Sequence, residues 1–249
     1  MPGNSSPGVR ALRGGLAWGV AAVVLGALAT GSAAAPLAGG GFTLWVQQLS
    51  VPQLAQELKE AGYGELPTSI LLYGGGGQGP VGRSAVGGGF TTGGFGAGGG
   101  AQVTSGQAWA QLALGFGGVR FGFDAPITES VSIDGGLGVA FGAASLTVVP
   151  DRGACKDFAL SSPCERTYAR FLLALVPDLS LSLSLSRFLH AQVGVGYFFD
   201  TGLGAGRWTT VTGDDVQGGP ADSLSGLQYR LTLVFGVRAL RPARWPAAW

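Results

Sequence analysis

The sequence predicts an all-β fold, an antiparallel meander that closes into a β-barrel of about 8–12 strands, with one short N-terminal helix at about residues 51–61. Two observations lead to this prediction. Apolar and polar residues alternate in several segments, which is the period of a β-strand with two unlike faces. The polar members are mostly Ser, Gly, Thr and Gln, as in the LSLSLSLS run from Leu179 to Ser186. Such small, weakly polar faces fit a barrel lumen better than a solvated surface.

The composition supports one large domain that is poor in charge. The chain has 249 residues, enough for a sizeable core. Charged residues make up 12% of it, about half of the roughly 25% that is typical of soluble domains. The net charge is +1, so no overall field would attract nucleic acid, and we expect no nucleic-acid partner.

Residues 1–34 have the pattern of a cleavable signal peptide. Arg10 and Arg13 supply positive charge, and the apolar run Leu16–Ala29 follows. The small residues Ser32-Ala33-Ala34 then offer a cleavage site. An uncleaved N-terminal anchor is the alternative. We therefore expect an exported protein with a single barrel-like domain over residues 35–238.

The two cysteines also fit an exported protein. Cys155 and Cys164 lie in one loop-like segment that contains Pro163. We expect a disulfide between them, because disulfides persist in oxidising compartments. A metal site needs more ligands than two thiols, and the only histidine, His190, lies in a distant strand.

The first elements of the mature chain are a strand and a helix. Thr43–Leu49 is expected as a strand. Ser50 is expected as the helix N-cap, with Gln53 as its partner in a capping box. Gly62 lies where a C-terminal cap belongs. One apolar stripe marks the helix between them: Leu54, Leu58 and Ala61.

Residues 68–106 are dense in glycine and allow two interpretations. One is a flexible linker. The other is a set of strands whose glycines lie under aromatic side chains of neighbouring strands, as in curved sheets and barrels. We favour strands, because apolar residues such as Leu72, Tyr73, Phe90 and Phe95 interrupt the glycines.

Clearer strands follow, and their connections alternate in length. Residues 167–186 form either one long strand or a strand pair, with Pro177 marking a bulge or a sheet edge. The other strands expected are 108–123, 131–141, 189–197 and 227–238. The connections expected are 124–130 and a tight turn at Ser186-Arg187, both short, and 150–166 and 200–225, both long.

With these features the chain resembles outer-membrane β-barrel proteins at the level of the class. The resemblance rests on the signal peptide, the alternating hairpins from about 107 to 238, and aromatic residues at strand ends. These aromatic residues are Trp109, Phe123, Phe141, Tyr197, Phe198 and Tyr229. It implies a lipid bilayer as partner and an outer-membrane location. The Arg/Pro/Trp tail 239–249 departs from many such barrels, which end on a strand that closes on an aromatic residue.

Other motifs give no catalytic, cofactor-binding or metal-binding residues. Residues 77–84 nearly match a phosphate-binding loop, but Arg83 replaces the lysine and no helix follows, so no nucleotide is expected. We interpret His190 as a structural or loosely solvated residue. The acidic residues Asp214, Asp215 and Asp222 match no calcium loop and are expected to be solvated.

Three functions compete on this basis. The first is an exported outer-membrane-type barrel that is structural or forms a narrow pore. The second is a soluble exported barrel or sandwich, periplasmic or extracellular, that binds an apolar ligand or a protein partner. Periodicity alone does not say which face lies inside, but the lack of charge on the polar faces favours the membrane. The third is an exported enzyme such as a hydrolase, for which the sequence offers no catalytic constellation. The oligomeric state stays open.

Overall fold

The computed structural model describes residues 36–83, 88–106, 108–150, 166–202, 207–210 and 223–238. Four predictions lie outside these residues. They are the signal peptide 1–34, the disulfide between Cys155 and Cys164, the acidic cluster of Asp214, Asp215 and Asp222, and the tail 239–249.

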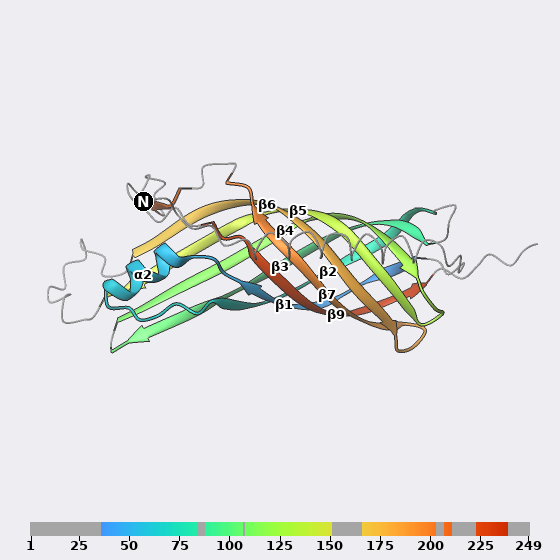
Figure 1. The fold of residues 1–249 in the computed structure, drawn as a ribbon, viewed down its shortest axis with the longest axis horizontal. Coiled ribbons are helices and arrows are strands. Elements are labelled where there is room, and N and C mark those ends of the chain that lie inside the picture. The colour runs from blue at the N-terminus through green and yellow to red at the C-terminus, as the bar shows by residue number, and fades with distance from the viewer. Residues whose placement is uncertain are drawn as a thin grey trace, which may run out of the picture.

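The described strands form one closed antiparallel barrel. In the sheet they follow the order β5-β4-β3-β2-β1-β9-β7-β6-β8, and a further pairing of β5 with β6 closes the cylinder (Figure 1). The strands are β1 (Leu37–Gln48), β2 (Ser69–Arg83), β3 (Gly89–Ser105), β4 (Ala108–Pro126), β5 (Val131–Val149), β6 (Arg166–Ser184), β7 (Leu189–Asp200), β8 (Thr209–Thr210) and β9 (Gly226–Arg238). β8 has only two residues and pairs with β6 at one end of the cylinder. The predicted fold class is therefore confirmed, at the lower limit of eight barrel strands.

The two ends of the barrel differ. The links β2–β3, β4–β5 and β6–β7 are short and lie together with Leu37 and Arg238 at one end, which we call the turn end. The opposite loop end carries the short link β3–β4, residues 106–107, and the three longer links β1–β2, β5–β6 and β7–β9 (Figure 1). The two connections expected to be long, 150–166 and 200–225, therefore leave the barrel at the same end, and the two expected to be short lie at the other.

The helix is confirmed, but its predicted cap is wrong. α2 spans Pro52–Glu60, and its N-cap is Val51, which makes no side-chain capping bond. The residue before a proline is disfavoured in the helical region. Val51 accordingly stays outside that region (φ −123°, ψ 56°), and Ser50 lies one residue too early to cap. Instead of completing a capping box, the Gln53 side-chain amide donates to Glu57 at 3.0 Å.

α2 packs its apolar side against the barrel. Leu54 and Leu58 are buried in the same apolar cluster as the inward side chains of the strands, whereas Ala61 is exposed. Gly62 follows the helix with φ +84°, the left-handed conformation that a C-terminal glycine supplies. Within the described residues, no helix is long and apolar enough to cross a membrane.

The glycine-dense segment forms strands, as predicted. It supplies β2 and β3, whose glycines pair in register with those of β1 and β4. The packing expected for these glycines is wrong at most positions, because an added Cβ atom would meet the backbone of a neighbouring strand and not an aromatic ring, as at Gly74, where it would lie 1.9 Å from the Gly96 carbonyl oxygen. Aromatic residues approach glycines of β5 instead. A Cβ atom added at Gly138 would lie 3.1 Å from the Phe95 ring, and one at Gly142 would lie 2.8 Å from the Cβ of Phe116.

Residues 166–184 form the single strand β6. Pro177 interrupts the ladder with β7 between Leu175 and Asp178, because proline has no N–H group to donate. The register is the same on both sides of this interruption. The predicted bulge is therefore absent at Pro177, and the alternation of faces continues along the strand.

Candidate functional site

Where the LSLSLSLS run lies in β6, its leucines point out of the barrel and its serines point in. Leu181 and Leu183 are 51% and 44% exposed, whereas Ser180 and Ser182 are 3% and 1% exposed. Ser182 faces Ser132 on one neighbouring strand and Gln192 on the other, so a polar row continues around the inner wall. This arrangement settles which face is inside: the apolar strand faces are outward.

Exposed apolar side chains surround the whole cylinder. Each of the eight long strands contributes at least one large hydrophobic residue that is at least one-third exposed. They include Phe42, Leu71, Phe90, Phe121, Phe141, Leu181, Val193 and Phe235. A soluble monomer seldom exposes a large continuous apolar surface, but lipid-facing strands require one. The outer face is therefore of the membrane-barrel type.

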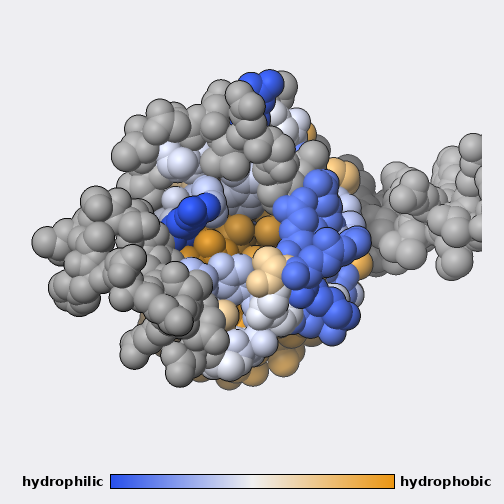
Figure 2. All heavy atoms as spheres, turned by 90° about the vertical axis from the view of Figure 1, so that its left-hand side faces the viewer, coloured by the Kyte–Doolittle hydropathy of each residue, from blue (hydrophilic) through white to orange (hydrophobic). Residues whose placement is uncertain are grey.

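Inside the barrel, the half toward the loop end is mainly apolar. Figure 2 looks onto this end and shows hydrophobic side chains within the hollow that the strands surround. The inward residues in this half are mostly small or aliphatic. They include Ala110, Leu112, Leu114, Ala144, Leu146, Leu172 and Ala174, all buried.

An aromatic layer crosses this half of the lumen. The ring centroids of Trp45 and Phe116 are 6.5 Å apart, those of Phe95 and Phe116 are 6.3 Å apart, and those of Phe116 and Phe198 are 5.2 Å apart. Phe116 lies on β4 and Phe198 on β7, three strands apart around the barrel. Phe198 lies near the end of β7, as expected, but its side chain is fully buried in the lumen and does not join the outer face.

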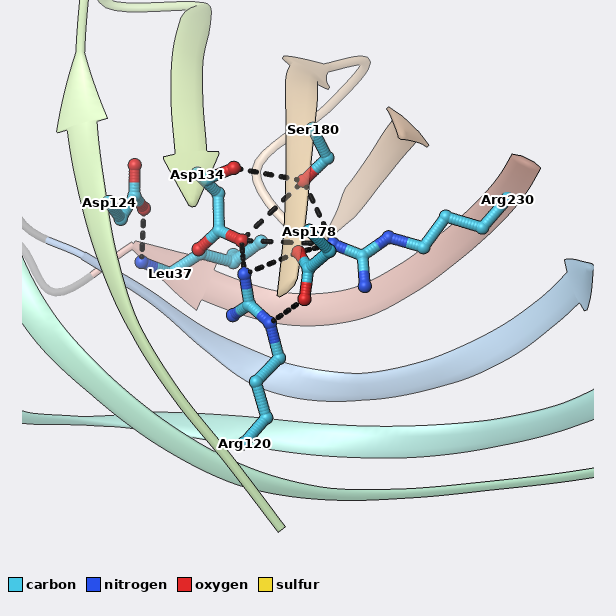
Figure 3. Close-up of polar contacts among 7 residues, drawn as sticks. All are labelled: Leu37, Arg120, Asp124, Asp134, Asp178, Ser180 and Arg230. Atoms are coloured by element: carbon cyan, nitrogen blue, oxygen red, sulfur yellow. Dashed lines mark hydrogen bonds and ion pairs between the residues drawn. The ribbon is translucent and has the colours of Figure 1, made fainter. Parts of the chain in front are cut away.

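The half toward the turn end holds an ionic cluster, formed by Arg120, Asp134, Asp178 and Arg230 (Figure 3). The Arg120 guanidinium donates to Asp178 at 2.8 Å from Nε and at 2.8 Å from Nη2, and it also contacts Asp134. Arg230 Nη2 donates to Asp178 at 2.6 Å and to Ser180 at 3.1 Å. Asp178 therefore joins two guanidinium groups from different sides of the lumen.

Inward glycines provide the space for these guanidinium groups. A Cβ atom at Gly136 would lie 2.7 Å from Cζ of Arg120, and one at Gly122 would lie 2.7 Å from its Nη1. At Gly194 a Cβ atom would lie 2.8 Å from Nε of Arg230. Glycine at these positions is thus a requirement of the ionic cluster as well as of strand packing.

Polar contacts continue from the ionic cluster to the turn end. The Thr43 and Thr232 hydroxyls are 2.9 Å apart and join β1 to β9. Closer to the turn end, Arg238 donates to Ser132 at 2.5 Å, and Asp124 accepts the backbone N–H of Leu37 at 3.1 Å.

His190 has the structural position expected of it. It is 2% exposed, and its Nδ1 lies 2.9 Å from the Ser184 hydroxyl. Among the residues that the structure describes, no group of three or more His, Cys, Asp or Glu side chains is placed to hold a metal ion.

A second ion pair lies closer to the loop end. Arg170 Nη2 is 2.5 Å from Asp200, and both side chains are at most 5% exposed. Asp200 also accepts the backbone N–H of Leu224, so this pair connects β6 and β7 to the start of β9. Residues 77–83, which resemble a phosphate loop, are part of strand β2, and no helix N-terminus follows them in the structure as described.

Sequence reasoning missed the ionic cluster. The sequence contains a signal for it, because charged residues are scarce in this chain, at 12%. Four of them fall on the polar faces of alternating strands: Arg120, Asp134, Asp178 and Arg230. The strand register shows why the position of a residue on the polar face of its own strand is not enough to predict the cluster. Arg120 and Asp178 are 58 residues apart in sequence, so their contact depends on how β4, β5 and β6 pair.

Among known proteins, the chain is similar only to solved structures. No family model and no curated protein matches the chain. A structure of Ail, the attachment invasion locus protein of Yersinia pestis, in complex with the heparin analogue sucrose octasulfate, is 11% identical with a TM-score of 0.45, and the alignment covers 80% of this chain and 98% of Ail. A second structure of Ail is 12% identical with a TM-score of 0.41, and the alignment covers 81% of this chain and 96% of Ail.

Proposed function

We propose that this chain is an exported integral protein of an outer membrane whose barrel is closed to ions and whose role is structural. The observation that carries the membrane location is the inside-out distribution of side chains, with apolar residues exposed on all eight long strands and ion pairs buried in the lumen. The eight long strands have 12 to 19 residues, more than the roughly 9–11 that cross a bilayer. The loop end faces the cell exterior, since such barrels turn their short connections to the periplasm.

Two layers of side chains, one after the other along the barrel axis, close the lumen. The aromatic layer of Trp45, Phe95, Phe116 and Phe198 crosses the loop-end half, and the ionic cluster crosses the turn-end half. An ion would have to displace both. This favours a structural barrel over the narrow pore.

Membrane extraction tests the location. In fractionated cells the mature protein is expected in the outer-membrane fraction, released by detergent and retained after washes with high salt or carbonate. Recovery as a monomer in the soluble fraction after mild lysis would instead support the soluble exported barrel.

Conductance tests the closed lumen separately. The purified protein, inserted into a planar lipid bilayer, is expected to give no discrete current steps, because both layers exclude hydrated ions. A general porin inserted under the same conditions provides the positive control. Uniform current steps that scale with the amount of inserted protein would show that the barrel is a pore, and would leave its membrane location intact.

A further inference from the structure

A small cavity lies in the lumen between the aromatic layer and the ionic cluster. It has a volume of about 70 Å³ and borders Trp45 and Phe95 on one side and Arg120 and Arg230 on the other. Its remaining wall is largely backbone, formed by the glycines of β1, β2 and β3: Gly39, Gly40, Gly41, Gly75, Gly76, Gly77, Gly93 and Gly94. The glycines thus create this cavity, because they have no side chains to fill the lumen at these positions.

The polar lining of this cavity is rich in donors. Its side chains include two guanidinium groups and the amides of Gln78 and Gln192, and none of its lining residues is acidic. The carboxylates of Asp134 and Asp178 already pair with both guanidinium groups but are not part of this lining, and Asp178 borders a neighbouring cavity of about 40 Å³. The buried Nε atom of Arg230 is left without a hydrogen-bond partner among the described residues. The buried Nε2 atom of Gln78 has no hydrogen-bond partner among the described residues.

This lining fits a small anion in size and in two donors that have no hydrogen-bond partner among the described residues, Nε of Arg230 and Nε2 of Gln78. A volume of about 70 Å³ holds roughly five water-sized groups, at about 10–15 Å³ each. Guanidinium groups and amide N–H groups are preferred donors to carboxylates and oxyanions. We propose that the cavity binds a small monovalent carboxylate or oxyanion of three or four non-hydrogen atoms, between Arg120, Arg230 and Gln78. This site would exist whether or not the barrel conducts ions.

Thermal unfolding of the full barrel in detergent micelles tests the site. Sodium formate is compared with sodium gluconate at equal ionic strength, since both are carboxylates and only formate fits the cavity. We expect the unfolding midpoint to rise with formate concentration and to level off, as binding to the folded state requires. Equal midpoints in the two salts at every concentration would overturn the proposal.

Two variants assign the effect to the cavity. Gln78→Leu leaves the ionic cluster intact and is expected to raise the half-saturating formate concentration about tenfold, the loss of one charge-assisted hydrogen bond. Arg230→Gln is expected to abolish the formate effect, whereas Arg187→Gln, in the exposed β6–β7 turn, is expected to retain it. If Arg230→Gln does not fold, Gln78→Leu alone decides. A formate effect unchanged in Gln78→Leu would contradict binding in this cavity.

Discussion

Replacing Asp178 with alanine is expected to destabilise the barrel by about 3–5 kcal/mol, the usual cost of removing one partner from a buried ion pair. Its carboxylate accepts three hydrogen bonds, two from Arg120 and one from Arg230, and its side chain is only 5% exposed. Without it, two guanidinium groups share Asp134 alone. The free energy of unfolding, measured by urea denaturation in phospholipid vesicles with tryptophan fluorescence, checks this expectation.

A control and a double variant isolate the ionic contribution. Glu129→Ala changes an exposed carboxylate in the β4–β5 turn and is expected to stay within about 0.5 kcal/mol of the wild type. Asp178→Asn combined with Arg120→Gln removes one charge of each sign and is expected to cost less than Asp178→Ala, because no guanidinium group is left in excess. A loss below about 1 kcal/mol in Asp178→Ala would mean that water already solvates the cluster.

Replacing Leu175 with arginine is expected to destabilise the membrane-inserted barrel by about 2–4 kcal/mol, the cost of a cation on the lipid face near the bilayer midplane. Leu175 is the middle residue of β6 and is 42% exposed on its outer face. On a soluble protein, an arginine at such an exposed position would be close to neutral. The same urea titration in vesicles gives the difference.

Position along the strand provides the matched control. Leu185 is also exposed, at 54%, but lies in the β6–β7 turn at the end of the barrel. Leu185→Arg is expected to cost about 0–1 kcal/mol, as for a charge near the interface. Equal costs at the two positions would argue against a bilayer around β6.

The sequence predicted the strands well because alternation is local. The run Leu179–Ser186 was enough to place two unlike faces on β6, and the interrupted glycines were enough to indicate β2 and β3. Periodicity does not tell which face of a strand points into the barrel, because an alternating strand has the same pattern with its apolar face inside or outside. The missing charge on the polar faces favoured the correct orientation, which closure of the sheet then fixed.

Nonlocal and irregular features escaped prediction. Phe198 lies in the run Tyr197-Phe198-Phe199, where three aromatics in sequence give no alternation to tell inward from outward. The ionic cluster depends on register across several strands, and its arginines also require inward glycines at Gly122, Gly136 and Gly194. Ser50 matched a capping pattern, but the restriction that Pro52 places on Val51 decided where the helix begins.

A membrane-spanning barrel requires lipid contact at the outward leucines. A spin label at Leu181→Cys, in a Cys155→Ser/Cys164→Ser background and reconstituted into vesicles, reports its access to oxygen, which concentrates in lipid, and to a water-soluble nickel chelate. A barrel that spans the bilayer predicts high oxygen and low nickel accessibility at position 181. It predicts the reverse at Arg187→Cys, in the turn that the barrel exposes to water. Nickel accessibility at position 181 as high as at position 187 would contradict a membrane-spanning barrel.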